Sequence, residues 1–207
     1  MIRFYRARFS TNVERVALAL AHKGLEAESV WIDKSDRSAV ERVSGQELVP
    51  VIADGGTVVA DSMQIIAYLE ERYPRAPLYP DDEARRAEML LFVDWFNRVW
   101  KVAPNAIDAE LDAAWPDNDR VAALGAEMTV ALDRFEVLLT GRDHLFGDDF
   151  SAADCAAFPF VKYALLPLEP EDEERYHAIL GEYQPLGDDH PRLAAWIERV
   201  DGRPRVA

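Results

Sequence analysis

The sequence predicts a small α/β domain followed by a larger all-helical domain. Three observations support this fold class. Short β-like runs alternate with helical patterns over the first 78 residues, a proline-rich segment follows, and only helical periodicity appears beyond it. The length of 207 residues suits two small domains. We therefore expect domains over residues 1–78 and 79–207.

The first part of the chain predicts the element order β-α-β-α-β-β-α. We expect strand 2–5, helix 12–22, strand 29–33, helix 38–43, strands 51–53 and 57–60, and a helix that Asp61 caps. The tripeptide Asp54-Gly55-Gly56 between the last two strands is typical of a hairpin turn. This order describes a thioredoxin-like sandwich, although other small α/β folds share it.

The rest of the chain predicts an all-α helical bundle. Residues 74–82 (PRAPLYPDD) contain three prolines and no helical period, which is typical of a linker. Helices are expected over 83–108, 119–140, 152–165, 171–180 and 192–200. Trp95, Phe96 and Trp100 lie along the first of them. Such a stripe is typical of core packing, and less often of an apolar ligand pocket.

Composition excludes several classes of function. No stretch approaches the roughly 20 apolar residues of a membrane helix, and the start MIRFYRARFS lacks a signal-peptide core, so we expect a cytoplasmic protein. The net charge is -15, with 13 basic against 27 acidic residues after residue 78, which disfavours nucleic acids and anionic membranes as partners. Cys155, the one cysteine, forms no internal disulfide, and the four histidines show no metal-ligand spacing. We expect no metal.

Two short motifs predict a ligand site. Val49-Pro50 directly precedes the hairpin, and its peptide bond is either an ordinary trans link or a cis link that opens the Val49 backbone to a peptide-like ligand. Asp61-Ser62 opens the next helix, where backbone N–H groups and the helix dipole suit a carboxylate and Asp61 suits an ammonium group. Alternatively, Asp61 only caps the helix and Ser62 is solvated.

These motifs stand within longer strings that resemble a known family. LVPVIADGGTVVADSMQIIAYLEERYP is similar to the glutathione-binding segment of cytosolic glutathione S-transferases, and FSTNVERVALALAHKGL resembles their first helix. FSAADCAAFPF and HPRLAAWIERVDGRPRV resemble the capping box and the closing helix of their helical domain. The resemblance implies the GST fold, glutathione as co-substrate and a homodimer. It implies glutathione binding by Val49, Pro50, Asp61 and Ser62.

The resemblance also assigns the catalytic hydroxyl to Ser10, where serine-type members carry a serine. Its hydroxyl would donate a hydrogen bond to the thiol sulfur and stabilise the thiolate. Ser10 alternatively caps the helix that follows, and the two roles are compatible. Thr11, Asn12 and Tyr5 are the competing candidates for the catalytic group.

The expected function is a glutathione S-transferase that adds the thiol of glutathione to a small hydrophobic electrophile, as in detoxification. The second-substrate pocket would lie in the helical domain. The alternatives are a glutathione-dependent isomerase, dehalogenase or thiol oxidoreductase on the same fold, or a non-catalytic ligand-binding protein. Lys34, Arg37 and Gln46 are the candidates for binding the glycyl carboxylate, and the sequence does not choose among them.

Overall fold

The computed structural model describes residues 1–207 and divides them into two compact units. The first unit contains Met1–Pro80 and Arg203–Ala207, and the second contains Asp81–Gly202. The chain thus leaves the first unit within the proline-rich segment and returns to it for its last five residues. There the Val206 N–H donates to the Ala17 carbonyl at 3.2 Å, which fixes the returning segment on the first long helix.

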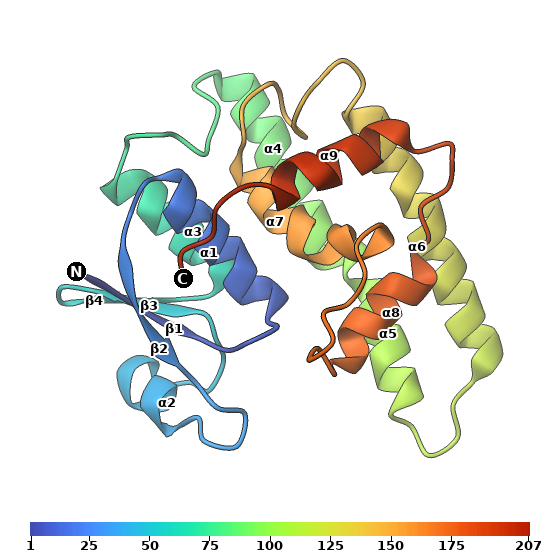
Figure 1. Cartoon of the computed structure of the whole chain (residues 1–207), viewed down its shortest axis with the longest axis horizontal. Coiled ribbons are helices and arrows are strands. Elements are labelled where there is room, and N and C mark those ends of the chain that lie inside the picture. The colour runs from blue at the N-terminus through green and yellow to red at the C-terminus, as the bar shows by residue number, and fades with distance from the viewer. The chain divides into compact units, whose positions relative to one another are not determined.

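The first unit is a four-stranded sheet with three helices (Figure 1). Its elements are β1 (Ile2–Arg6), α1 (Thr11–His22), β2 (Ala27–Trp31), α2 (Ser38–Ser44), β3 (Val51–Asp54), β4 (Thr57–Ala60) and α3 (Ser62–Arg72). The strand order is β2-β1-β3-β4, in which β1 pairs parallel with β2 and antiparallel with β3, and β3 pairs antiparallel with β4. The predicted element order and the thioredoxin-like sandwich are confirmed.

Strand alternation divides the core of this unit between the two faces of the sheet. Tyr5 pairs with Val51, and both pack in an apolar cluster with Val40 of α2. The neighbouring pair, Phe4 and Ile52, therefore points to the opposite face. Helices α1 and α3 pack side by side over that face (Figure 1). The sheet is buried on both sides, as a layered α/β domain requires.

The second strand is the element that the sequence misplaces. We expected 29–33 from its β-branched and aromatic residues, but β2 spans Ala27–Trp31. Parallel pairing with β1 begins at Ile2 opposite Ala27, so β1 sets the first and last residues of β2. Asp33 instead forms a turn, in which its Oδ1 accepts the Ser35 N–H at 2.8 Å.

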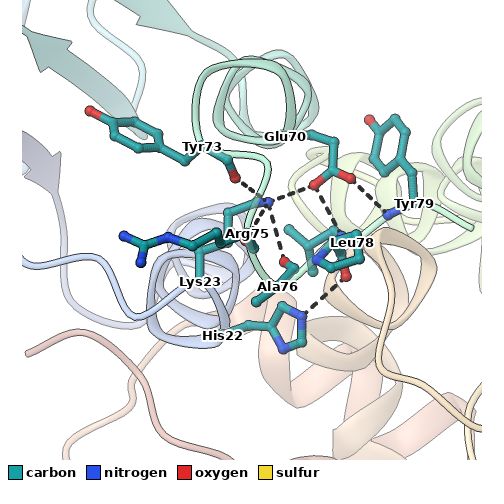
Figure 2. Close-up of polar contacts among 9 residues, drawn as sticks. His22, Lys23, Glu70, Tyr73, Arg75, Ala76, Leu78 and Tyr79 are labelled. Atoms are coloured by element: carbon teal, nitrogen blue, oxygen red, sulfur yellow. Dashed lines mark hydrogen bonds and ion pairs between the residues drawn. The ribbon is translucent and has the colours of Figure 1, made fainter. Parts of the chain in front are cut away.

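The proline-rich segment is hydrogen-bonded to the first unit (Figure 2). The buried ammonium of Lys23 lies 2.6 Å from a carboxylate oxygen of Glu70. It also donates to the carbonyls of Tyr73, Arg75 and Ala76, at 2.9, 3.5 and 3.3 Å. Glu70 accepts the N–H groups of Leu78 and Tyr79, at 3.0 and 3.3 Å, and His22 Nε2 lies 3.2 Å from the Pro77 carbonyl. We call these nine residues the linker clasp.

The second unit is entirely helical, as predicted (Figure 1). Its elements are α4 (Glu83–Trp95), the π-helix η1 (Phe96–Trp100), α5 (Val102–Leu111), α6 (Asn118–Leu138), α7 (Ala152–Val161), the 3₁₀ turn η2 (Lys162–Ala164), α8 (Arg175–Tyr183) and α9 (Pro191–Asp201). Every residue of α7 is buried. None of the helices has both the length and the apolar character needed to cross a membrane.

Several helix limits in this unit differ from the prediction by a few residues: α6 ends at Leu138 instead of 140, α7 ends at Val161 and is followed by η2, and α8 ends at Tyr183 instead of 180. Two other differences have a local cause. The helix expected over 83–108 is interrupted by the π-helix and restarts at Val102, which places Pro104 in the first turn of α5. A proline is tolerated there because the first-turn N–H groups need no helical partner. Helix α8 starts at Arg175 instead of 171, because Asp172 forms a turn whose side chain accepts the Glu174 N–H at 3.1 Å.

The Ser151–Asp154 capping box is present, and it anchors the buried helix α7. Asp154 Oδ2 accepts both the N–H and the hydroxyl of Ser151, each at 2.8 Å. Its Oδ1 accepts the Leu145 N–H at 3.1 Å and the indole N–H of Trp196 at 2.7 Å. One buried carboxylate thus joins α7 to the preceding loop and to α9.

Candidate functional site

The sheet register brings three segments of the chain to one edge of the first unit. Tyr5, the next-to-last residue of β1, pairs with Val51, and Val51 pairs with Ala60 at the end of β4. The loop after β1, the Val49-Pro50 dipeptide before β3 and the start of α3 therefore lie at the same end of the three strands. Most of the predicted ligand residues fall in these segments, although they are up to 52 positions apart in the sequence.

Ser10 is the N-cap of α1, one of its two predicted roles. Its Oγ accepts the Val13 N–H at 3.3 Å, and its side chain is half-buried. Because the oxygen acts as acceptor in this bond, the hydroxyl proton can be donated to a ligand atom. The nearby helix N-terminus adds positive potential, which favours an anion such as a thiolate.

The competing candidates for the catalytic group are less well placed than Ser10. Tyr5 is buried in the apolar cluster with Val40 and Val51, on the α2 face of the sheet and opposite to α1. Thr11 is the first residue of α1 and is buried. Asn12 follows it inside the helix and is half-buried. Ser10 is therefore the candidate that is both partly exposed and placed at the N-terminus of α1.

Asp61 and Ser62 form the start of α3. Asp61 Oδ1 accepts the N–H groups of Met63 and Gln64, at 2.9 and 3.1 Å, so the predicted capping role is present. The backbone of Asp61 has φ 71°, a left-handed value that is strained for a residue with a side chain. Such strain is enriched at ligand sites. Asp61 is exposed, whereas Ser62 is buried and not solvated.

The peptide bond between Val49 and Pro50 is cis, one of the two forms that we considered. Val49 is half-buried, and Pro50, directly before β3, is buried. The preceding loop is shaped by Gln46, whose Nε2 donates to the Leu48 carbonyl at 2.8 Å and whose Oε1 accepts the Leu48 N–H. Gln46 thus holds the backbone in front of Val49.

Neither of the other two candidates for the glycyl carboxylate is singled out by its position. Lys34 is exposed in the turn after β2, and Arg37 is half-buried at the N-cap of α2. The choice among Lys34, Arg37 and Gln46 stays open.

Arg15 is the residue of this region that sequence reasoning missed. It lies on α1 with only 2% of its surface exposed, and its Nη1 donates to Ser62 Oγ at 3.2 Å. The sequence did contain a signal for its burial. Thr11, Leu18 and Ala19, which lie on the same face of the helix as Arg15, are uncharged, and all three are buried. A charged residue on such a face needs a polar partner. The sequence could not show that the partner is Ser62, 47 positions away.

The aromatic stripe of the second unit is mainly core. Phe96 and Trp100 are buried and stack with their ring centroids 4.5 Å apart. Two adjoining open hollows of about 430 and 440 Å³ lie along α6; the first faces η1 and the start of α5, and the second faces α4. Trp95 lines both hollows, and Trp100 lines only the first. Arg134 lines both hollows too, and its guanidinium lies 5.4 Å from the Trp95 ring centroid. The exposed face around them is largely apolar.

The described side chains contain no candidate metal centre and no exposed thiol. Nowhere do three or more His, Cys, Asp or Glu side chains gather as ligands for an ion. Cys155 is fully buried within α7.

Comparison with known proteins places both units in one family. Residues 4–77 match the family model of the glutathione S-transferase N-terminal domain, and residues 118–199 match that of the C-terminal domain. Glutathione S-transferase Z1 of Arabidopsis thaliana is 30% identical over 216 residues, which cover 98% of this chain and 88% of that protein.

Solved structures give the same result over the whole chain. A glutathione S-transferase from Rhodospirillum rubrum F11 is 26% identical with a TM-score of 0.76, covering 99% of this chain and 89% of that one. A theta class glutathione S-transferase from Xanthomonas axonopodis pv. citri, solved with glutathione bound, is 25% identical with a TM-score of 0.72, covering 98% and 93%. Because the matches span both units in order, this chain belongs to the glutathione S-transferase family.

Proposed function

We propose that this protein is a serine-type glutathione transferase, which activates the thiol of glutathione for addition to a small hydrophobic electrophile. The observation that carries the proposal is the shared sheet edge at which the N-termini of α1 and α3 meet, with the Ser10 hydroxyl at one and Asp61-Ser62 at the other. One helix start suits a thiolate and the other suits a carboxylate.

In the proposed mechanism, glutathione binds as an extended peptide at this edge. The backbone of Val49, before Pro50, pairs with the backbone of the ligand. The α3 N-terminus and the Ser62 hydroxyl bind the carboxylate of the γ-glutamyl group, and the exposed carboxylate of Asp61 attracts its ammonium. The Ser10 hydroxyl then donates a hydrogen bond to the sulfur and keeps its proton, while the thiol proton is released to solvent water.

Ser10 acts by shifting the protonation equilibrium of the thiol. A free thiol has a pKa near about 8.5 and is mostly protonated at neutral pH. A hydrogen bond and a helix N-terminus both favour the thiolate, so they lower that pKa. The thiolate then attacks a carbon of the electrophile and forms a carbon–sulfur bond. In an addition the electron pair of the attacked π bond moves onto the neighbouring atom and is protonated, and with 1-chloro-2,4-dinitrobenzene the carbon–chlorine bond breaks and chloride leaves. No covalent bond to Ser10 forms.

The test separates catalysis by Ser10 from capping by Ser10. In Ser10→Ala both the cap and the donor are lost, whereas Ser10→Asp keeps a capping oxygen but has no proton to donate at neutral pH. We expect both variants to lose about 10²-fold in kcat for conjugation of 1-chloro-2,4-dinitrobenzene, a scale typical of losing one transition-state donor. Only Ser10→Ala should lose stability, by about 1 kcal/mol.

The matched control is Ser35→Ala, which removes a hydroxyl from an exposed turn of the same unit. It should conjugate at the wild-type rate. Glutathione affinity, measured by calorimetry, should change little in Ser10→Ala. A Ser10→Ala variant that is less stable yet turns over normally would reduce Ser10 to a helix cap.

The alternatives on this fold are separated by the fate of the thiol. A thiol oxidoreductase that works through a protein thiolate is disfavoured, because Cys155 is fully buried in the second unit. An isomerase would return glutathione unchanged, whereas a transferase retains its sulfur in the product. Mass analysis of the products distinguishes them. A non-catalytic carrier would bind apolar ligands with no dependence on glutathione.

We also propose a homodimer in the cytoplasm, with detoxification of electrophiles as its role. The support for a dimer is the exposed apolar face along α6, where Trp95 lines both hollows, Val130 lines one and Val137 lines the other. Val130 and Val137 are 62% and 68% exposed. Apolar surface of this kind marks interaction sites. Light scattering should give twice the chain mass of 23.4 kDa, and a monomer at micromolar concentration would refute the dimer.

A further inference from the structure

Arg15 brings a positive charge into the interior of the first unit, directly behind the start of α3. Its side chain is almost fully buried, and its Nη1 lies 3.2 Å from Ser62 Oγ. A guanidinium stays charged at physiological pH and has no acceptor capacity. Arg15 is therefore the donor in this bond, and the Ser62 oxygen is the acceptor.

This bond fixes what the Ser62 hydroxyl can do. The oxygen is occupied on the interior side, so its one proton is left to be donated away from Arg15. A hydrogen bond from a charged donor also polarises the O–H group and strengthens its own donation. Ser62 is the first residue of α3, where the backbone N–H groups favour an anion as well. A carboxylate at this point would meet oriented donors with a buried cation behind them.

We propose that Arg15 is a positioning residue for the carboxylate of the γ-glutamyl group, acting through Ser62. It holds the hydroxyl in the donor orientation and adds positive potential at the position of the carboxylate. The inference rests on the proposed function, because it takes glutathione as the ligand. It assigns Arg15 to ligand recognition and leaves activation of the sulfur to Ser10.

The experiment compares two ligands that differ in one group. Glutathione carries the carboxylate in question, and 4-aminobutyryl-cysteinylglycine lacks only that carboxylate. Calorimetry measures the Kd of both for the wild type, Arg15→Met, Arg15→Lys and Ser62→Ala. We expect Arg15→Met to raise the Kd for glutathione by about 10- to 100-fold, the range for a hydrogen bond that involves a charged group. The Kd of Arg15→Met for the shorter ligand should stay within about twofold of the wild-type value. That ligand has no carboxylate at this point, so it has no interaction there to lose.

Kinetics give a second readout that a purely structural role would not move. Arg15→Met should raise KM for glutathione and leave kcat at saturating glutathione close to the wild-type value. Ser10→Ala should do the reverse. Adding Ser62→Ala to Arg15→Met should have little further effect on the Kd for glutathione. The two residues form one hydrogen-bonded pair, so the effects of their substitutions should not add.

The outcomes separate the inference from the function it rests on. If Arg15→Met weakens both ligands equally, Arg15 only supports the fold and the inference is wrong, while the proposed function stands. If the wild type binds neither ligand, the proposed function is wrong and the inference falls with it. If Arg15→Met does not fold, Arg15→Lys decides, since its ammonium cannot reproduce the guanidinium geometry. It should lower the preference for glutathione over the shorter ligand, and an unchanged preference would overturn the inference.

Discussion

The two units bury acidic and basic residues unequally: Glu136 and Asp154 are buried in the second unit, and Arg15 and Lys23 are buried in the first. In the second unit Asp154 is an anion that accepts four hydrogen bonds, all from uncharged protein groups. In the first unit the buried groups are cations on and just after α1. Lys23 is paired with Glu70 and three backbone carbonyls, and Arg15 is bonded to Ser62.

The identity of the partners tells what each charge is for. The partners of Asp154 join a loop, α7 and α9, so this charge serves the fold. The carbonyl partners of Lys23 belong to the segment through which the chain leaves the first unit, so this charge fixes the path of the chain. The partner of Arg15 is a predicted ligand residue. Removing the partners of Asp154 should therefore lower stability, removing the carboxylate partner of Lys23 should loosen the linker, and replacing Arg15 should weaken ligand binding.

The largest effect on stability is expected from Asp154→Ala. The N–H groups of Ser151 and Leu145 and the indole N–H of Trp196 would be left without their acceptor in a buried region. Each unsatisfied buried donor costs roughly 1–3 kcal/mol, so the free energy of unfolding should fall by at least about 3 kcal/mol. Urea unfolding measures the change.

The control for this prediction is Asp149→Ala, in which an exposed carboxylate of the preceding loop is removed. Its free energy of unfolding should stay within about 0.5 kcal/mol of the wild type. Glutathione affinity of folded Asp154→Ala protein should be unchanged. Equal urea midpoints for Asp154→Ala and wild type would show that the buried carboxylate is not what anchors α7.

A smaller effect is expected from Glu70→Gln, which weakens the linker clasp. The fully buried ammonium of Lys23 would keep its carbonyl partners but lose its one carboxylate. Breaking a fully buried pair costs roughly 3–5 kcal/mol, and because Glu70 is 19% exposed we expect about 2 kcal/mol. The released segment should also be cut faster by trypsin after Arg75.

Glu71→Gln is the matched control, because Glu71 is the exposed neighbour of Glu70 on α3. It should leave both stability and the rate of cleavage after Arg75 at the wild-type values. If Glu70→Gln is cleaved no faster than Glu71→Gln, the clasp does not restrain the linker.

Local signals account for what the sequence predicted correctly. The hairpin and the Asp61 cap follow from turn and capping residues within a few positions, and both were found as predicted. The limits of β2 depend on pairing with β1, and the role of Gln46 depends on how its loop folds back, so neither was visible. Arg15 was missed for the same reason, since its partner Ser62 is 47 positions away in the sequence. Its burial could have been suspected from the uncharged face around it.

The smallest effect concerns the pH dependence of the clasp at His22. His22 Nε2 lies 3.2 Å from the Pro77 carbonyl, and Arg203 donates to His22 Nδ1 at 2.9 Å, so the neutral ring with its proton on Nε2 fits both partners. Burial lowers the pKa of His22 from 6.5, the nearby cations Arg203 and Lys23 lower it further, and the Pro77 bond and Glu70 oppose this. The unfolded chain therefore takes up this proton at a higher pH than the folded chain does. Stability from this group is complete above about pH 6.5 and decreases as the pH falls below it.

His22→Gln, whose amide can still donate to the carbonyl, should lose less stability than the wild type between about pH 7 and about pH 5.5, because the variant has no such proton to bind. Urea unfolding at both pH values measures the difference, and the other histidines contribute equally to both proteins. Identical losses would mean that His22 is not the group that makes the clasp sensitive to pH, and would leave the Lys23–Glu70 pair as its electrostatic component.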